Sequence, residues 1–273
     1  MALNPDTLVK RIYLKRKPAS KKRDFGKVLV IGGSKVFTGA PALSAMAALR
    51  SGADLVVVAA PERAADTVAS FSPDMITVPF EGDFFSEKHA QAIEELVLDA
   101  DAVVIGPGLG REKKTMAFVK KILPKIKIPC VIDADALYVV MDVMLHGNFV
   151  LTPHRGEFRM LLGEEHGKDA SKKLAKKTGA IIIAKGPVDF ISDGKNVYPN
   201  KTGTPYMTTG GTGDVLAGVC AAILARGTDS FEAACAGAYI TGLAGEAAAK
   251  KFGDGLVGSD VINELPKIIM GLY

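Results

Sequence analysis

The sequence predicts a three-layer α/β/α fold with a mostly parallel central sheet. Short β-branched runs bounded by glycines alternate with longer segments in which apolar residues recur at helical spacing. Such alternation favours parallel strands covered by helices on both faces. The 273 residues have room for one large α/β domain or two small ones, and no linker or internal repeat divides them. We therefore expect one domain over residues 27–273, preceded by a basic N-terminal extension over residues 1–26.

Short apolar segments mark the expected strands. Residues 27–32 read K-V-L-V-I-G, a β-branched run that ends at a glycine, which is typical of a buried parallel strand. Further strands are expected over residues 54–60, 75–79, 101–105, 129–132, 148–152 and 180–184. A hairpin is expected over residues 188–198 because Asp193-Gly194 forms a turn between two apolar runs.

Helical segments separate these strands. The alanine-rich segment 41–50 begins with Pro41, whose missing N–H suits the first position of a helix. Apolar residues repeat at helical spacing over residues 86–99. Further helices are expected over residues 113–123, 215–225, 231–250 and 259–270.

A glycine-rich stretch, T-G-G-T-G-D-V-L-A-G at residues 209–218, leads into one of these helices. Glycine allows the backbone to turn tightly and to approach a ligand closely, because it has no Cβ. The first N–H groups of a helix are unpaired and carry the positive end of its dipole, which suits a phosphate. Asp214 lies in this turn, so it is either an ordinary helix-start residue or a base that accepts a proton from an attacking hydroxyl.

Other polar or glycine-rich segments follow predicted strands. The loop G-P-G-L-G occupies residues 106–110, and His154 follows the strand expected over residues 148–152. Open α/β sheets bind their ligands at the carboxyl ends of the strands, so these segments are expected to face one crevice. The alternative to a ligand-facing His154 is a histidine buried in the hydrophobic core. Asp133 and Asp135 also follow a strand and could hold a metal or a helix start; we do not expect them to be primary catalysts.

The charged residues are unevenly distributed. The formal net charge is +4, yet residues 1–27 alone hold nine Lys or Arg and two acidic residues. This segment lacks the aromatic or glycine-rich interleaving of an RNA-binding arm and the apolar core of a signal peptide. Apolar runs elsewhere are shorter than the roughly 18 residues that a membrane helix needs. We therefore expect neither nucleic acid nor membrane as a partner, and we interpret the extension as solvated or as an oligomer contact.

The three cysteines indicate a reducing compartment. Cys130, Cys220 and Cys235 are odd in number and lie in apolar surroundings. Buried, reduced thiols in a cytoplasmic protein fit this pattern better than disulfides do.

The chain resembles the ADP/ATP-dependent NAD(P)H-hydrate dehydratases of the ribokinase-like superfamily, from about Lys27 to the C-terminus. The motif at residues 209–218 is shared with many small-molecule kinases, whereas T-P-H-R-G-E is narrower, because related kinases usually carry Asn where His154 stands. The full set is V-I-G-G-S (30–34), T-G-A-P-A-L-S-A (38–45), G-P-G-L-G (106–110), D-A-D-A-L (133–137), T-P-H-R-G-E-F (152–158), K-G (185–186) and T-G-G-T-G-D-V-L-A-G (209–218).

Three departures accompany the resemblance. Family members are often fused to an N-terminal epimerase domain, where this sequence has a basic segment of 26 residues. The segment after K-G usually ends in Thr, whereas this chain has Asp189. The loop over residues 203–207 reads G-T-P-Y-M, where Asn and a second Gly are commoner. These differences bear on the adenine-nucleotide contacts rather than on the reaction.

The resemblance implies a ribokinase-like fold and a hydro-lyase. The substrates would be NADH-hydrate and NADPH-hydrate in the S form, with ADP or ATP as co-substrate and Mg²⁺ as cofactor. Asp214 would be the base, and Glu157 would help to hold Mg²⁺. Ala40, Gly108, Gly110 and His154, with Asp214, would line the hydrate pocket; Lys185, Gly186, Pro187, Val188, Asp189, Gly210, Gly211, Thr212 and Gly213 would bind the nucleotide. A homo-oligomer such as a tetramer, and a separate NAD(P)H-hydrate epimerase as a partner, are also implied.

Three alternative functions stay open at the level of sequence. A ribokinase-like kinase of a vitamin precursor or another small alcohol would stop after phosphorylation. A nicotinamide-dependent dehydrogenase is disfavoured because the glycines at residues 32–39 do not have the G-x-G-x-x-G spacing. A non-catalytic nucleotide sensor is disfavoured because Asp214 and its glycines are present.

Overall fold

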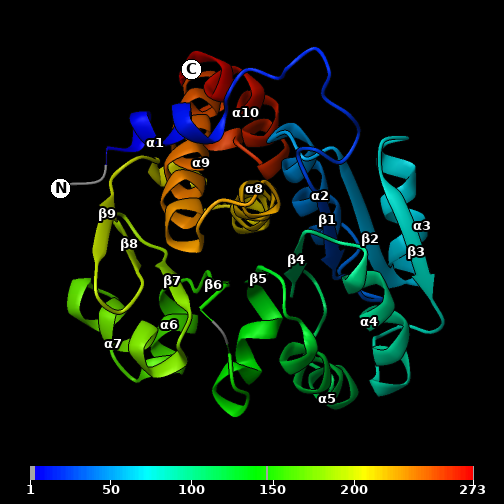
Figure 1. Ribbon diagram of the computed structural model, residues 1–273. Coiled ribbons are helices and arrows are strands. Elements are labelled where there is room, and N and C mark those ends of the chain that lie inside the picture. Colours follow the sequence, from blue (N-terminus) through cyan, green and yellow to red (C-terminus); the bar gives the residue numbers. More distant parts are fainter. Residues whose placement is uncertain (1–3, 146, 273) are drawn as a thin grey trace.

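A computed structural model describes residues 4–145 and 147–272. Within these residues, nine strands form one sheet in the order β3-β2-β1-β4-β5-β6-β7-β8-β9 (Figure 1). Strand β1 (Lys27–Ile31) pairs in parallel with β2 (Leu55–Pro61) on one side and with β4 (Ala102–Ile105) on the other. The order of the strands therefore reverses between β1 and β4, the point at which open α/β sheets bind ligands.

The remaining strands are β3 (Ile76–Phe80), β5 (Cys130–Ile132), β6 (Phe149–Leu151), β7 (Ile181–Ala184), β8 (Asp189–Ser192) and β9 (Val197–Asn200). The strands from β3 to β7 are parallel, and β8 and β9 complete the sheet as the expected antiparallel hairpin. The α-helices are α1 (Pro5–Ile12), α2 (Ala40–Arg50), α3 (Glu62–Phe71), α4 (Ala90–Leu98), α5 (Lys113–Ile122), α6 (Arg155–Leu162), α7 (Lys168–Thr178), α8 (Thr212–Ala225), α9 (Ser230–Phe252) and α10 (Gly258–Leu272). Short 3-10 turns are η1 (Glu87–His89), η2 (Leu123–Lys125), η3 (Ala134–Asp142), η4 (Pro205–Met207) and η5 (Gly253–Gly255).

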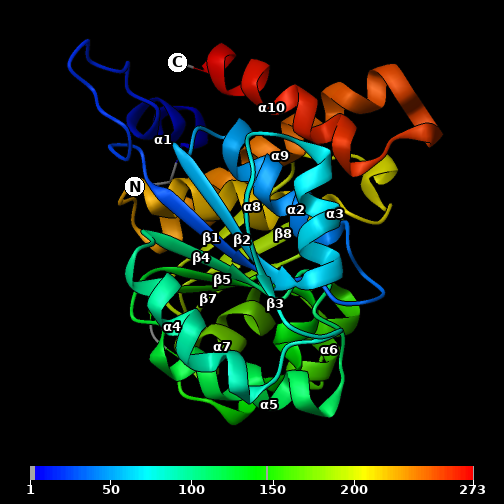
Figure 2. The same ribbon diagram turned by 90° about the vertical axis from the view of Figure 1, so that its right-hand side faces the viewer.

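Two hydrophobic cores cover the two faces of the sheet, which confirms the three-layer prediction (Figures 1 and 2). Side chains alternate along β1, so Val28 and Val30 join one core whereas Leu29 and Ile31 join the other. The first core contains α2, α3, α8, α9 and α10 and is rich in alanine. The second contains α4, α5, α6 and α7 and is filled by large rings such as Phe118.

Every predicted strand and helix is present, with ends shifted by a few residues. The helices α1, α3, α6 and α7 were not among the expectations. Helix α6 begins at a capping box in which a histidine takes the place of the usual Ser or Thr. Helix α7 is polar, with burial limited to Ser171, Leu174 and Ala175, so its apolar periodicity is weak.

The N-terminal extension is structured rather than simply solvated. Helix α1 starts at the side-chain cap of Asn4 with Pro5 in its first turn, and it buries Leu8 and Val9 against α9 and α10. Three basic side chains of the extension form ion pairs with the rest of the chain: Arg11 with Glu232, Arg16 with Asp54, and Arg23 with Asp99. The prediction of a solvated tail is therefore wrong for this helix, because two apolar side chains on one face provide a packing surface.

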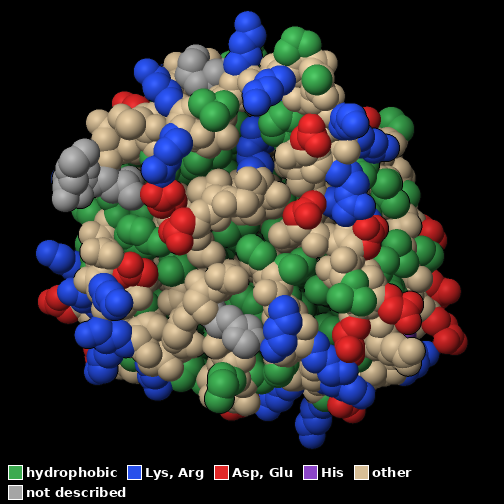
Figure 3. Space-filling view, in the orientation of Figure 1, with side chains coloured by type: hydrophobic (Ala, Val, Ile, Leu, Met, Phe, Trp, Pro, Cys, Tyr) green, Lys and Arg blue, Asp and Glu red, His purple; other side chains and the backbone are tan. Residues whose placement is uncertain are grey.

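Three further expectations drawn from composition concern the cysteines, membrane-spanning helices and the distribution of charge. Cys130, Cys220 and Cys235 are buried and unbridged, as predicted. In the part of the chain that the structure describes, no helix combines the length and hydropathy that crossing a membrane requires. Basic and acidic side chains are interspersed over the face shown in Figure 3, so the excess of positive charge does not form one continuous basic surface there.

Candidate active site

The candidate site lies at the carboxyl edge of the sheet, where the first turn of α8 meets the ends of several parallel strands. Helix α8 packs across β1, β4 and β5, near the point where the strand order reverses. Gly211 forms its N-cap with a φ of +97°, a left-handed conformation that favours glycine. The Thr212 hydroxyl donates to the carbonyl oxygen of Met207 at 2.8 Å, which secures the loop ahead of the helix. The first amides of an α-helix have no acceptor within the helix and suit an anion, which is the role that the sequence analysis expects of this turn.

A buried ion pair lies directly beside this turn. The Lys185 ammonium donates to Asp133 Oδ1 at 3.1 Å, and the Thr152 hydroxyl donates to the same oxygen at 2.6 Å. The Asp133 side chain is 2% exposed and that of Lys185 is 21% exposed. A Cβ on Gly213 would lie 3.1 Å from Lys185 Nζ, so the ammonium group is next to the glycine-rich turn. Lys185 thus presents a fixed positive charge where a phosphate would bind.

The Asp214 carboxyl group is strongly perturbed by this environment. Burial and the nearby Asp133 carboxylate raise its pKa to about 8, although Lys185 opposes the shift. A carboxyl group with a pKa near the working pH is suited to accept a proton from a hydroxyl and to release it afterwards. The Ser44 hydroxyl donates to the backbone oxygen of Asp214 at 2.9 Å and so ties the first turn of α8 to α2.

Opposite charges explain why the Lys185 side chain stays protonated although it is largely buried. Burial alone would lower its pKa, but the charges of Asp133 and Glu157 outweigh that effect and raise it. The ammonium form is therefore favoured. Its charge interacts with the carboxylates of Asp133, Glu157 and Asp214, which come from distant parts of the chain. Perturbed groups gathered in this way at a strand edge are a mark of functional sites.

Glu157 and His154 belong to one capping box at the start of α6. The His154 amide donates to Glu157 Oε2 at 2.8 Å, and His154 Nδ1 accepts from the amides of Gly156 and Glu157 at 2.9 and 3.2 Å. A neutral imidazole whose Nδ1 accepts must carry its proton on Nε2. That nitrogen lies 3.5 Å from Glu157 Oε1, and the His154 side chain is 61% exposed. His154 is therefore not a core histidine, and its Nε2–H is available as a donor.

The Glu157 carboxylate is suited to contribute to a Mg²⁺ site. Burial raises its pKa, whereas the charge of Lys185 opposes the shift. In residues 4–145 and 147–272, His, Cys, Asp and Glu side chains form no group of three that could hold a metal ion. Magnesium in phosphate-transfer sites commonly takes one or two carboxylates and completes its coordination with water and phosphate oxygens. The buried Glu157 carboxylate, whose charge interacts with that of Lys185, fits that requirement.

The small residues expected to line the substrate pocket lie together at the switch point. A Cβ on Gly108 would be 3.2 Å from Ala40 Cβ, so the β4 loop touches the start of α2. The Gly110 amide donates to Asp135 Oδ2 at 2.9 Å. The charge of Asp135 also contributes to the raised pKa of Asp214, which links this cluster to the first turn of α8. Among the described residues, the hydrogen bonds and ion pair of His154 lie within its own capping box rather than with these residues.

The predicted nucleotide segment over residues 185–189 divides into two parts. Lys185 points to the carboxylates, whereas Gly186 and Pro187 are exposed between β7 and β8. Asp189 closes the segment by accepting from the Gly186 amide and from Asn200 Nδ2, both at 3.0 Å. Val188 is half-buried within this turn, and Gly210 is exposed ahead of the turn that begins α8. The segment is thus a rigid rim on one side of the anion-binding turn.

Sequence reasoning undervalued two residues in this arrangement. Asp133 was not expected to be central, yet it holds Lys185 and raises the pKa of Asp214. Thr152 lies at the end of β6 and was not among the candidate residues, although its hydroxyl satisfies the Asp133 carboxylate. The available signal was positional, because both residues follow buried strands at the edge where ligands bind.

Comparisons with known proteins agree with this geometry. A family model described as NAD(P)H-hydrate dehydratase matches residues 28–267. A bifunctional NAD(P)H-hydrate repair enzyme of Pyrobaculum aerophilum is 46% identical over 93% of this chain and 52% of its own length. An ADP-dependent (S)-NAD(P)H-hydrate dehydratase of Cenarchaeum symbiosum is 38% identical over 96% of this chain and 94% of its own. The chain therefore spans about half the length of the first of these relatives and nearly all of the second.

The fold has matches among solved structures. The ADP/ATP-dependent NAD(P)H-hydrate dehydratase of Bacillus subtilis, co-crystallized with ATP/Mg²⁺, superposes with a TM-score of 0.84 at 23% identity, covering 98% of this chain and 97% of that one. At that identity the likeness concerns the ribokinase-like fold, and it agrees with the mostly parallel nine-stranded sheet. The extent of the family match and the identity to the Cenarchaeum relative over almost the whole chain show that this chain belongs to the NAD(P)H-hydrate dehydratase family.

Proposed function

We propose that the protein dehydrates the S form of hydrated NADH and NADPH in a reaction that consumes ADP or ATP. The observation that carries the proposal is the Asp214 carboxyl group, with a pKa of about 8, held beside the Lys185 ammonium at the start of α8. A proton acceptor and a fixed cation at one anion-binding turn are the parts that phosphoryl transfer to a hydroxyl requires. The relative of 38% identity, which is ADP-dependent by name, supports the same reaction.

The chemistry explains why a kinase-like site serves a dehydratase. Hydroxide is a poor leaving group, since bulk water has a pKa near 15.7. In the first step the ring hydroxyl oxygen forms a bond to the terminal phosphorus, the bond from that phosphorus to the nucleotide breaks, and the hydroxyl proton passes to Asp214. In the second step the carbon–oxygen bond breaks and phosphate leaves with the electron pair, assisted by the lone pair of the ring nitrogen. Loss of a proton from the neighbouring ring carbon completes the reduced nicotinamide.

The residues around Asp214 have distinct tasks in the first step. The amides of Gly211, Thr212 and Gly213 stabilise charge on the transferred phosphoryl oxygens, and Lys185 adds a positive charge on the same side. Lys185 is held for this task by Asp133. Glu157 would hold Mg²⁺ against the nucleotide phosphates, where the ion neutralises part of their charge.

The two substrates occupy opposite sides of this turn in the proposal. Ala40, Gly108 and Gly110 allow the nicotinamide ring to approach the Asp214 carboxylate closely, because they carry little or no side chain. His154 Nε2–H is a donor to a polar group of the hydrate. Residues 185–189 and Gly210 flank the nucleotide on the other side.

Three finer features belong to the proposal. We expect the protein to act in the cytoplasm, where its substrates form, and to assemble as a homo-oligomer such as a tetramer. We also expect a separate epimerase to supply the S form from the R form, since only one epimer presents its hydroxyl to Asp214. The bifunctional name of the Pyrobaculum relative is consistent with two coupled activities in that protein.

The decisive experiment supplies chemically hydrated NADH with ADP or with ATP and follows the return of the reduced nicotinamide absorbance. Formation of NADH that depends on the nucleotide supports the proposal, and reactions without nucleotide or with the R epimer are the controls. Consumption of nucleotide without NADH would instead identify a kinase that stops after phosphorylation. Hydride transfer from NADPH to a carbonyl compound would point to a dehydrogenase.

A further inference from the structure

A pocket lies at the end of helix α8 that is remote from the candidate active site. It has a volume of 470 Å³, and its lining includes the cationic side chains of Lys15, Arg16, Arg50 and Arg226. Arg226 directly follows the C-terminus of α8, whereas Asp214 lies in its first turn. Twelve residues of helix separate them by about 18 Å at the usual rise per residue. This pocket is therefore distinct from the candidate active site.

The charge of the pocket is strongly positive. Its lining contains four cationic side chains and no carboxylate. Asp54 pairs with Arg16 at 2.9 Å from outside the lining, and the C-termini of α2 and α8 each contribute about half a negative charge. These groups offset only part of the positive charge, which leaves about +2. Within residues 4–145 and 147–272, Lys15 and Arg50 have no ion-pair partner.

Two of the guanidinium groups are held rigidly. Arg16 and Arg226 both donate to the carbonyl oxygen of Gly52 at 3.1 Å. Both also pack on the Phe25 ring, at 3.9 and 4.9 Å from its centre. Two like charges fixed against one carbonyl and one ring attract an anion, and a planar guanidinium matches the oxygens of a phosphate. Their fixed positions reduce the entropy lost when an anion binds.

The pocket also has an apolar side. Leu14 is 70% exposed and Met270 is 67% exposed, and both belong to the lining. Ligand pockets of about 300–1,000 Å³ enclose small organic molecules, and this one falls in that range. An apolar wall opposite a cationic wall suits a ligand with an organic part and a charged part.

We propose that this pocket binds a phosphate-bearing small molecule of nucleotide size, with its phosphates at the cationic wall formed by Lys15, Arg16, Arg50 and Arg226 and its organic part against Leu14 and Met270. The proposal gives a role to the basic N-terminal extension, which supplies Lys15 and Arg16. It goes beyond the proposed reaction, because it concerns binding at a site remote from Asp214.

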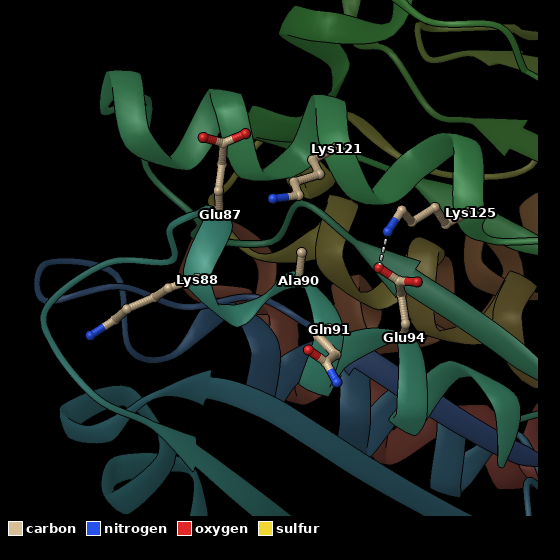
Figure 4. Close-up of a pocket in the computed structure, with 7 residues that line it drawn as sticks. All are labelled: Glu87, Lys88, Ala90, Gln91, Glu94, Lys121 and Lys125. Atoms are coloured by element: carbon tan, nitrogen blue, oxygen red, sulfur yellow. Dashed lines mark hydrogen bonds and ion pairs between the residues drawn. The ribbon is translucent and has the colours of Figure 1, made fainter.

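A second groove of similar size provides a matched control. It has a volume of 440 Å³ and contains three lysines, but Glu87 and Glu94 share the lining (Figure 4). Lys125 is paired with Glu94 across this groove. Its cations are thus largely neutralised, and we expect it to bind no phosphate.

The test compares two double variants that change the net charge equally, K15E/R50E in the basic pocket and K121E/K125E in the control groove. Titration calorimetry with inorganic triphosphate should detect two classes of site in the wild type, one at the active site and one in the pocket. K15E/R50E should weaken one class at least tenfold and leave turnover with ADP unchanged, whereas K121E/K125E should keep both classes. Equal weakening in both variants, or an unchanged isotherm in K15E/R50E, would overturn the proposal.

Two further arms keep the result interpretable. Melting curves verify folding, and the neutral variant K15Q/R50Q replaces K15E/R50E if charge reversal prevents folding; it should weaken the same class of site. Vesicles that contain phosphatidylserine test an anionic membrane surface as the occupant. Sedimentation with these vesicles that K15E/R50E abolishes and that triphosphate does not displace would overturn the assignment to a small molecule.

Discussion

Two glycines in the same helix show how differently one residue type is used. Gly213, in the first turn of α8, faces the Lys185 ammonium, and an added Cβ would lie 3.1 Å from it. Gly218, one turn further along, faces the backbone of α2, and an added Cβ would lie 2.1 Å from the Ser44 carbonyl oxygen. The first glycine leaves room beside the Lys185 ammonium, whereas the second allows two helices to pack closely. In the proposed function, the first turn of α8 takes part in the chemistry, whereas the middle of the helix packs against α2.

The largest effect is expected from Asp214→Asn, which removes the proposed base from the first turn. Turnover should fall by about 10²–10⁴-fold. Burial raises the pKa of Asp214 to about 8, so this carboxyl group stays protonated in the folded state at pH values where it ionises in the unfolded chain. Stability is therefore lost as pH rises from the unfolded pKa to about 8. The variant should therefore melt at or above the wild-type temperature at pH 7. Retention of more than half the activity would rule out Asp214 as the base.

His154→Asn separates capping from substrate contact on the other side of the site. Asn is a good N-cap residue, so α6 should keep its stability, whereas His154→Ala should lose about 1 kcal/mol. Both changes remove the Nε2 donor, and the KM for the hydrate should rise roughly tenfold to a hundredfold with little change in the KM for ADP. Steady-state kinetics and melting curves on the same preparations test this prediction. Parallel changes in both KM values would argue against a substrate contact.

Gly218→Ala should disrupt the packing of α8 against α2. Because the new Cβ would meet a backbone oxygen of α2, the two helices must move apart. Overpacking of this kind costs about 1–3 kcal/mol of unfolding free energy, more than the gain in helix propensity of Ala over Gly. Urea denaturation provides the measurement. An unchanged midpoint would mean that α2 and α8 are less tightly packed than the structure indicates.

Gly213→Ala is the matched change in the first turn, and it should have the opposite profile. Its Cβ would lie close to side-chain atoms alone, 3.1 Å from Lys185 Nζ and 3.9 Å from Asp133 Oδ2, so unfolding free energy should stay within about 1 kcal/mol of wild type. Displacement of the Lys185 ammonium should weaken ADP binding by about tenfold, since a charged hydrogen bond contributes about 1.5–3 kcal/mol. Calorimetry with ADP tests this, and an unchanged affinity would place the phosphates elsewhere.

The pH dependence of kcat/KM in the wild type should be a smaller effect than those of the substitutions, but it reports specifically on Asp214. The base must be deprotonated, so kcat/KM for the hydrate should rise about tenfold per pH unit below the pKa of Asp214, which burial raises to about 8, and should level off above it. Rate profiles of wild type and Gly218→Ala should share this shape, because the change in packing leaves the carboxyl group in place. A plateau that begins near pH 4 would show that Asp214 keeps an ordinary pKa in the free enzyme.

Sequence patterns were sufficient for the sheet and for the main helices. Six parallel strands, β1, β2, β4, β5, β6 and β7, are buried almost throughout, so each appears as an unbroken apolar run that local composition identifies. The capping box of α6 and the polar helix α7 escaped because a histidine cap and a mostly polar helix give weak local signals. Helix α1 escaped because its basic composition concealed the buried pair Leu8 and Val9.

The sequence by itself determined which residue types reach the carboxyl edge of the sheet, because strand ends and glycine-rich turns are local features. Only the tertiary structure decided which of them act together. Lys185 and Asp133 are separated by 52 residues in the chain, and they meet because β5 and β7 flank β6 in the sheet. The same distinction applies to α8, because the residue type of Gly213 and Gly218 is the same and does not reveal their different roles. Their roles differ because one faces buried charges and the other faces the backbone of α2.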